Sequence, residues 1–299
     1  RRNAVLELID SQGKLNDGLK SAIFDAETKQ RLEDLYLPYK VKRRTKAEIA
    51  REAGLDELAD LLLADHTREP VAEAGAFVRE PFSSAQGDNP GVADAKSALE
   101  GARYILMDRF SEDAQLLAEL RGLIWERAHL TSAVVADKED VGAKFRDYFD
   151  YSEPLKRVPP HRALALFRGR SEGVLRLALK FPEELENTGY SMELGPCERR
   201  LSHHFSLKDE GRAADGWFTE VVRLTWRGKL APSIETNLLS TLRATAEEEA
   251  IRVFAQNLKD LLLAAPAGMH ATMGLDPGIR TGVKVAVVAA TGKLLDTAT

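Results

Sequence analysis

Two short segments of the chain concentrate positively charged side chains, and both could bind the phosphates of a nucleic acid. Residues 36–53 carry a net charge of +4 and residues 155–180 carry +6, whereas the whole chain carries −5. Lys and Arg gathered on an otherwise acidic body are typical of a surface that binds a polyanion. An ordinary solvated surface with uneven charge gives the same pattern, so charge alone leaves both readings open.

In the first segment, cations follow two tyrosines, a combination that suits an unpaired nucleic-acid strand. The residues concerned are Tyr36, Tyr39, Lys40, Lys42, Arg43, Arg44 and Lys46. Cations neutralise phosphates, and the face of a tyrosine ring stacks on an unpaired base. Two alternatives stay open: the tyrosines anchor the segment to a core, or the segment packs against another domain.

The second segment is rich in arginine and surrounds a predicted helix start. Its candidate contacts are Arg157, His161, Arg162, Arg168 and Arg170. The first turn of a helix attracts an anion, and a planar guanidinium suits two-pronged contact with a phosphate better than an ammonium does. We therefore expect this segment to contact nucleic acid as well.

Other catalytic and metal-binding patterns are weak. Cys197, His203 and His204 lack the closed four-ligand spacing of structural zinc, and no Ser-His-Asp arrangement or Walker-type loop stands out. A single cysteine excludes a disulfide framework and fits a reducing compartment, so we expect a cytoplasmic protein. No apolar run reaches the roughly 18 residues that a membrane span needs, which predicts no membrane partner.

Apolar residues recur with helical spacing through most of the chain. Residues 49–53 and 55–62 predict two short helices joined at Gly54, a helix-turn-helix-like unit that also occurs in bundles which never touch DNA. The Pro- and Gly-rich residues 81–91 predict an exposed loop. The other predicted elements are helices at 92–110, 112–136, 161–168, 213–228 and 233–264, and a strand or short helix at 174–181.

The sequence changes character after Gly268. Short β-rich stretches separated by Pro277-Gly278 and Thr291-Gly292 predict three strands, which cannot bury a face by themselves. The predicted fold is therefore mainly α, a multi-helix N-terminal assembly with a long connecting helix, followed by the first β-hairpins of another domain. We expect three regions, at 1–80, 81–268 and 269–299. Because the chain starts at Arg1 within a helical pattern, we also expect a fragment.

Two long motifs resemble the bacterial Tex family of transcription accessory proteins. They are LYLPYKVKRRTK at 35–46, followed by AEIAREAGL, and FRDYFDYSEPLKRVPPHRALALFRGRSEG at 145–173. In addition, GLDPGIRTG at 274–282 resembles the start of that family's YqgF/RuvC-like domain. The resemblance extends over essentially the whole chain and implies that its last hairpins begin a truncated RNase H-like α/β domain. It also implies helix-hairpin-helix units and an oligonucleotide-binding barrel beyond this chain.

Asp276 is the candidate catalytic residue that the resemblance supplies. In RNase H-like nucleases a carboxylate of the first strand binds one of two divalent metal ions, so Mg²⁺ or Mn²⁺ is expected only at a site completed in a longer protein. Relatives usually carry an acidic residue where this chain has Ala289, which weakens a carboxylate role there. Two alternatives to a catalytic role stay open. Asp276 begins a turn, or it belongs to a phosphate-binding hairpin together with Thr281, as in sugar kinases.

The predicted function is sequence-tolerant binding of RNA or DNA in support of transcription, through phosphate contacts instead of base recognition. Nucleic acid and the transcription machinery, including RNA polymerase, are the expected partners. One alternative is a helical scaffold that docks polymerase or braces the further domains. Another is a metal-dependent RuvC-like nuclease in the longer protein, since a single aspartate cannot hold two metal ions in this chain.

Overall fold

The computed structural model describes the chain except residues 41–42, 187–192, 266–267 and 279–281. Its contacts divide into two units, Arg1–Glu247 (unit 1) and Glu248–Thr299 (unit 2). Helices dominate and strands end the chain, so the predicted fold class is confirmed. No helix among the described residues has both the length and the apolar character needed to cross a membrane. The three expected regions remain a prediction.

The first three helices form a small core of their own at the start of unit 1. They are α1 (Arg2–Asp10), α2 (Asp17–Phe24) and α3 (Lys29–Tyr36). Asn16 and Thr28 cap α2 and α3, since each side chain accepts a hydrogen bond from a backbone N–H of the first turn. The buried apolar side chains of this core are Val5, Ile9, Ile23, Ala26, Leu32 and Tyr36.

The next four helices belong to the main core of unit 1. They are α4 (Lys46–Glu52), α5 (Leu55–Ala64), α6 (Pro70–Ala74) and α7 (Ala95–Ser111). As predicted, α4 and α5 meet at Gly54, whose φ of +83° is costly for other residues. Gly101 of α7 faces these helices, and a Cβ there would collide with Leu55. The missing side chain therefore allows α7 to pack closely on α4 and α5.

Residues 81–91 were expected to form a loop, and this expectation is wrong in part. They contain a short hairpin of β1 (Phe82–Ser84) and β2 (Gly87–Asn89). Asn89 holds this hairpin against α4, because its buried amide donates hydrogen bonds to the Ile49 carbonyl and to Glu52. The turn-forming residues thus correctly predict a bend here, but they do not predict the two short strands on either side of it.

A three-stranded antiparallel sheet follows α8 (Ala114–Arg127), and its central strand corrects a second prediction. Residues 112–136 were expected to be helical, but the helix ends at Arg127 and β3 (His129–Val134) begins. β3 pairs with β4 (Asp150–Pro154) and β5 (Leu175–Lys180) in the order β4-β3-β5. Thr131 and Val134 suit an extended backbone, and partners distant in sequence complete the strand. Of the two alternatives for residues 174–181, a strand or a short helix, the structure has the strand β5.

Helix α9 (Pro160–Ser171) lies between β4 and β5 in the chain and packs on β5. It begins within one residue of the predicted position, after the short 3₁₀ helices Ala143–Tyr148 and Leu155–Arg157. Gly169 permits the close approach to the sheet, because a Cβ there would collide with Leu175. The arginine-rich segment is thus displayed on a helix whose other face is fixed to a sheet.

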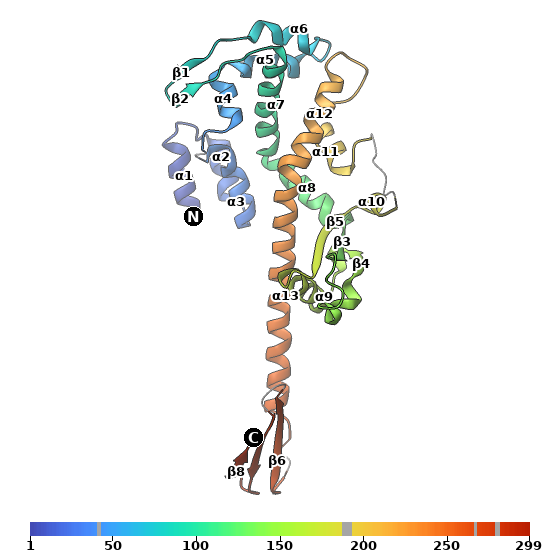
Figure 1. Cartoon of the computed structure of the whole chain (residues 1–299). Helices are drawn as coiled ribbons and strands as arrows, with labels where there is room; N and C mark the ends of the chain where they lie inside the picture. Colours follow the sequence, from blue (N-terminus) through green and yellow to red (C-terminus); the bar gives the residue numbers. More distant parts are fainter. Residues whose placement is uncertain (41–42, 187–192, 266–267, 279–281) are drawn as a thin grey trace. The chain divides into compact units, whose positions relative to one another are not determined.

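The last helices of unit 1 are α10 (Pro182–Glu186), α11 (Pro196–His204), α12 (Asp215–Thr225) and α13 (Ala231–Leu262). α13 continues into unit 2. The two helices predicted at 213–228 and 233–264 form one continuous helical run, joined by a π turn at Trp226–Leu230 (Figure 1). In this turn the Ala231 N–H bonds to the Trp226 carbonyl, five residues back. Pro232 has no N–H to donate to a preceding carbonyl. The helix nevertheless continues through it, because the π turn directly before α13 changes the hydrogen-bond pattern at this point.

Phe110 is at the centre of the main core. Its side chain is 0% exposed and stacks on Phe205, with ring centroids 4.0 Å apart. Phe110 ends the apolar face of α7, and Phe205 follows α11, so the ring pair fastens elements that are far apart in sequence. Residues of α8 and α12 belong to the same buried cluster.

A buried carboxylate fixes the start of α12. Asp215 is 3% exposed and accepts hydrogen bonds from the backbone N–H groups of Glu210 and Arg212, at 2.8 and 2.9 Å. Its other oxygen lies 3.0 Å from the Arg212 guanidinium and 3.2 Å from His66 Nδ1. Burial alone would raise the pKa of Asp215, but Arg212 and the two N–H groups outweigh burial and hold the pKa well below its usual range.

Unit 2 contains the predicted three strands, β6 (Thr272–Gly278), β7 (Gly282–Val288) and β8 (Leu294–Ala298), in an antiparallel sheet of that order. One detail differs from the expectation. Pro277 and Gly278 were expected to form a turn, but they belong to β6, and Pro277 pairs with Val283. A proline is tolerated there because β6 is an edge strand.

Candidate nucleic-acid interface

The cations of the first segment are largely engaged inside unit 1. Arg44 forms an ion pair with Glu52 at 2.6 Å and donates to the Asp88 carbonyl at 3.0 Å. Lys46 donates to the Tyr104 hydroxyl at 3.0 Å and lies over the Tyr104 ring. These two cations therefore hold the β1–β2 hairpin and α7 against α4, a role that competes with contact to phosphate.

The two tyrosines of this segment anchor it to a hydrophobic core, which is one of the alternatives considered above. Tyr36 is buried in the small N-terminal core, where its ring has no room for a base, and Tyr39 packs against the same core. Lys40 and Arg43 are exposed to solvent, whereas Lys42 lies outside the described residues. Lys46 is exposed as well, despite its contact with Tyr104, so Lys40, Arg43 and Lys46 are the accessible candidates among the described cations of the segment.

Acidification tests the role of Arg44. Its hydrogen bonds to Glu52 lower the pKa of that carboxyl to about 2, with help from Asn89 and Ser84. An unfolded glutamate titrates near pH 4.3. The stability that Glu52 contributes is therefore complete above roughly pH 4.3 and is lost as the pH falls toward 2. In urea unfolding from pH 7 to 2.5, we expect the wild-type chain and Glu52→Gln to differ most at neutral pH and to converge in acid.

The exposed control Glu57→Gln should follow the wild-type curve throughout. A constant difference between Glu52→Gln and the wild-type chain across this range would contradict a titrating contribution from the Arg44–Glu52 pair.

The helix-turn-helix-like unit packs on the main core through its second helix, α5, which buries Leu55, Leu58 and Leu62. The other side of α5 carries paired charges. Asp60 lies 2.5 Å from Arg109, and Asp56 lies 3.7 Å from the same arginine. A role of this unit in reading a DNA groove stays a prediction.

The second segment is accessible along α9 and the turn before it. Arg162 pairs with Glu153 at 3.1 Å, and Arg168 pairs with Glu172 at 3.0 Å. Arg157, His161 and Arg170 are exposed. Within the part of the chain that the structure describes, no hydrogen bond or ion pair engages these three side chains. The segment thus combines paired arginines with three side chains ready for a ligand.

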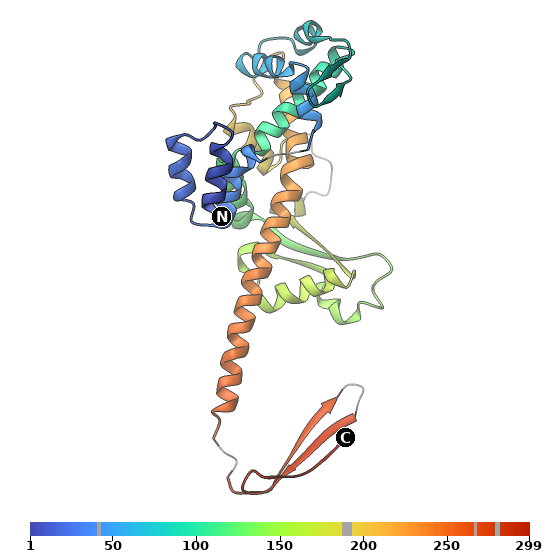
Figure 2. The same ribbon diagram turned by 90° about the vertical axis from the view of Figure 1, so that its left-hand side faces the viewer.

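The structure brings Arg170 together with a cation that sequence reasoning missed. Arg170 and Arg243 line one pocket of about 380 Å³ between α9 and the first half of α13, and Figures 1 and 2 show these two helices side by side. The other lining residues are Phe167, Ser171, Thr236, Leu239 and Ser240. We call this pocket the α9–α13 groove. Guanidinium and hydroxyl groups around an aromatic ring are the groups that bind phosphate and stack on a base.

Arg243 in the groove is held at 2.7 Å from Glu247, one turn further along α13. This i,i+4 pair is exposed, so it is weak and exchanges readily with a competing phosphate.

Arg243 was not predicted because it is a lone arginine in an acidic stretch, and only tertiary packing places it next to α9. A helical-face analysis of α13 could have identified it, since Thr236, Ser240 and Arg243 lie on one side.

The two basic segments lie at separate places in unit 1. The first lies between α3 and α4, and the second lies on the 3₁₀ helix Leu155–Arg157 and α9, which both views show apart (Figures 1 and 2).

Asp276 lies in β6 of unit 2, two residues from the end of the strand, instead of at the strand end where it was expected. Its side chain is exposed, and the Lys284 ammonium is 4.0 Å from its carboxylate. Among the described residues, no group of three or more His, Cys, Asp and Glu side chains is arranged to hold a metal ion. A cation next to Asp276 opposes metal binding, so the residues present do not fit a two-metal site. The catalytic role of Asp276 stays a prediction for a longer protein, and Thr281 lies outside the described residues.

Comparison with known proteins gives matches along nearly the whole chain. Residues 65–254 match the family model described as Tex central region-like, and residues 270–299 match the Tex protein YqgF-like domain. The chain is 54% identical to "Protein YhgF" of Escherichia coli over all of its length and 37% of that protein. It is 49% identical to "Transcriptional accessory protein Tex" of Neisseria gonorrhoeae, over 99% of the chain and 37% of the relative.

A more distant human relative is named "S1 RNA-binding domain-containing protein 1". It is 25% identical over 99% of the chain and 29% of its own length. The chain thus spans little more than a third of the relatives that it matches best among those described.

Proposed function

This chain belongs to the Tex family, and from that membership we propose that it binds RNA or DNA without sequence preference in support of transcription. The printed names of relatives point in this direction, since one is a transcriptional accessory protein and another has an RNA-binding domain. The binding is electrostatic, through the second basic segment, and RNA polymerase is the expected protein partner.

The α9–α13 groove is the observation that carries this proposal. It places Arg170 and Arg243 on two different helices around one concavity, together with three hydroxyl groups and the ring of Phe167. Two guanidinium groups bind adjacent phosphates, and the Ser171 and Ser240 hydroxyls donate to phosphate oxygens, whereas the Thr236 hydroxyl already donates to the Pro232 carbonyl.

Charge reversal in the groove tests the proposal. We expect Arg170→Glu/Arg243→Glu to weaken binding of a fluorescent single-stranded RNA by roughly tenfold or more and to reduce the slope of log affinity against log salt by about 1.4, at 0.7 per lost contact. Fluorescence anisotropy at several salt concentrations measures both quantities. The variant Glu247→Gln should strengthen binding, because it releases Arg243 from its ion pair.

The matched control is Lys20→Glu/Lys208→Glu, which changes the net charge equally at exposed positions of unit 1. Its affinity should stay within about twofold of wild type. Equal weakening by both double variants would mean that only overall charge matters, and a flat salt dependence would reject phosphate contact.

A bracing scaffold is the second candidate function. Large apolar side chains stay exposed in unit 2, on residues 251–263 of the chain and on the strands, with Phe254, Leu261 and Met273 among them. Such exposure is typical of surfaces that pack against further protein. If this chain fails to bind RNA or DNA while a longer family member binds it, the bracing role is the one supported.

A further inference from the structure

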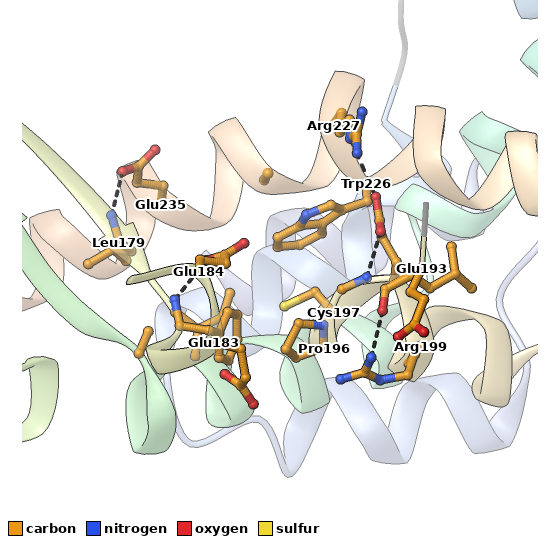
Figure 3. Close-up of a pocket in the computed structure, with 17 residues that line it drawn as sticks. Leu179, Glu183, Glu184, Glu193, Pro196, Cys197, Arg199, Trp226, Arg227 and Glu235 are labelled. Carbon is orange, nitrogen blue, oxygen red and sulfur yellow. Dashed lines mark hydrogen bonds and ion pairs between the residues drawn. The ribbon is translucent and has the colours of Figure 1, made fainter. Parts of the chain in front are cut away.

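The cavities of unit 1 differ in charge. The cavity that Figure 3 shows is acidic, since five glutamates and two arginines line it, and three of the glutamates accept hydrogen bonds from backbone N–H groups. Another cavity, of about 390 Å³, has a net charge of +2 and therefore suits an anion. We call it the Tyr39 pocket. Its charged lining residues are Lys14, Lys40, Arg44, Arg51, Glu48 and Glu112.

The Tyr39 pocket lies where the small N-terminal core meets the main core. The residues after α1 and the 3₁₀ helix Leu37–Tyr39 form one wall, whereas α4 and the bend of the β1–β2 hairpin form the other. The side-chain amide of Gln12 donates to the Tyr39 carbonyl at 2.8 Å, which joins the two segments of the first wall. The volume is typical of a small-ligand site, and a compact space of this size is about 9 Å across, so long side chains on both walls reach its centre.

Carboxylates of unit 1 fix the two arginines of this pocket. Glu52 accepts from Nε and Nη2 of Arg44 at 3.0 and 2.6 Å. Arg51 pairs with Glu48 and lies 3.6 Å from the buried Asp108. A guanidinium has five N–H donors, and no hydrogen bond among the described residues engages Nη2 of Arg51. Arg51 is thus positioned in advance with donors to spare, which lowers the entropy cost of binding a ligand.

Lys14 and Lys40 supply the charge that is not neutralised within the protein. Both side chains are exposed, and neither forms a hydrogen bond or an ion pair in the part of the chain that the structure describes. The hydroxyl of the half-buried Tyr39 has no hydrogen-bond partner among those residues either. All three groups are therefore free to donate to an anionic ligand in the pocket.

We propose that the Tyr39 pocket binds a phosphomonoester, the terminal phosphate of a nucleic acid or of a free nucleotide. Such a group carries close to two negative charges near pH 7 and has three acceptor oxygens, which matches the net charge and the donors of the pocket. Lys14 and Lys40 donate to it from one wall and Arg51 from the other. An internal phosphodiester carries a single charge, so the pocket binds it less tightly. This site goes beyond the proposed function, because it selects a chain end and does not depend on the α9–α13 groove.

Two trinucleotides that differ in one group test the proposal in the intact chain. Both are UpUpU with a fluorescein at the 3′ end, and one has a 5′-phosphate whereas the other has a 5′-hydroxyl. Fluorescence anisotropy gives the ratio of their dissociation constants. We expect the phosphorylated trinucleotide to bind at least about fivefold more tightly, because it adds charge-assisted contacts to the lysines. Equal affinity for the two trinucleotides would overturn the proposal.

Unlabelled uridine 5′-monophosphate separates the two sources of the phosphate. If it displaces the phosphorylated trinucleotide while uridine does not, the pocket accepts a free nucleotide. If neither competes although the fivefold preference is present, the pocket binds the end of a nucleic acid. Both results retain the phosphomonoester, whereas equal displacement by uridine would show that the phosphate is not recognised and would contradict the proposal.

A lysine variant locates the site. Lys14→Gln/Lys40→Gln removes two exposed charges that have no partner in the described chain, so the fold is preserved. The ratio of the two dissociation constants should fall to within about twofold of one. The matched control Lys20→Gln/Lys208→Gln, also at exposed positions of unit 1, should keep the wild-type ratio. A preference that survives Lys14→Gln/Lys40→Gln would reject this pocket as the binding site.

The charge reversal in the α9–α13 groove distinguishes this proposal from the proposed function. Arg170→Glu/Arg243→Glu should leave the ratio of the two trinucleotides unchanged, even where it weakens the binding of longer RNA. If longer RNA is unaffected by that variant but the 5′-phosphate preference is present, the proposed function fails and the Tyr39 pocket stands. Loss of the preference in the groove variant would assign the terminal phosphate to the groove and overturn the proposal.

Discussion

Replacing Asp215 by alanine is expected to lower the free energy of unfolding of unit 1 by about 3–5 kcal/mol. The change leaves the Glu210 and Arg212 N–H groups without their acceptor and deprives the Arg212 guanidinium of its buried counter-charge. Buried donors without partners keep their desolvation cost, which is why such losses are large. His66, stacked on Phe218 in the core, loses its contact in the same step.

Thermal unfolding followed by circular dichroism measures this effect. For a unit of this size the midpoint should fall by on the order of 10 °C. Asp209→Ala, which removes a nearby exposed carboxylate, should change the midpoint by only a degree or two. Similar losses in both variants would mean that the Asp215 network contributes no more than a surface contact.

Truncating Phe110 to alanine is expected to cost about 3–5 kcal/mol through a different mechanism. The ring is fully buried and stacked on Phe205, so its removal deletes apolar contacts and opens a cavity that the surrounding helices fill only in part. α7, which carries Phe110, also packs on α4, α5 and α12, and the loss therefore extends through the main core.

Labelling of the single cysteine measures this loss. Cys197 is buried and its pKa is raised, so it reacts with a thiol reagent only when unit 1 opens. Phe110→Ala should accelerate labelling in proportion to the population of open molecules. Phe24→Ala removes an equally large ring that is exposed on α2, and labelling should stay close to the wild-type rate. Comparable rates for the two variants would exclude a central role for Phe110.

Periodicity predicted the helices well where one face is buried along its whole length, as in α7 and α9. It failed at residues 129–134, because apolar residues after α8 continue a helical spacing while the strand is completed by β4 and β5 from elsewhere in the chain. It also separated α12 from α13 at Pro232, since the π turn that accommodates this proline depends on backbone geometry and has no apolar pattern of its own.

The candidate interface was only partly predictable for a related reason. Composition identified Arg170, but the partner cation Arg243 is contributed by packing of α13 on α9. Conversely, Arg44 and Lys46 looked like phosphate ligands, and their internal partners Glu52 and Tyr104 become neighbours only in the folded chain. Charge in a sequence therefore indicates where cations are, while tertiary structure decides which of them have partners within the protein.

The π turn at Trp226–Leu230 also determines which side of the following helix, α13, faces the core of unit 1. One residue more or less in a helix turns the later part by about 100°. Deleting Gly228 would close the turn into a regular helix and swing Ile234, Leu238 and Leu242 out of the buried cluster that they now complete. The number of residues in this turn therefore determines whether the apolar side of α13 faces the main core.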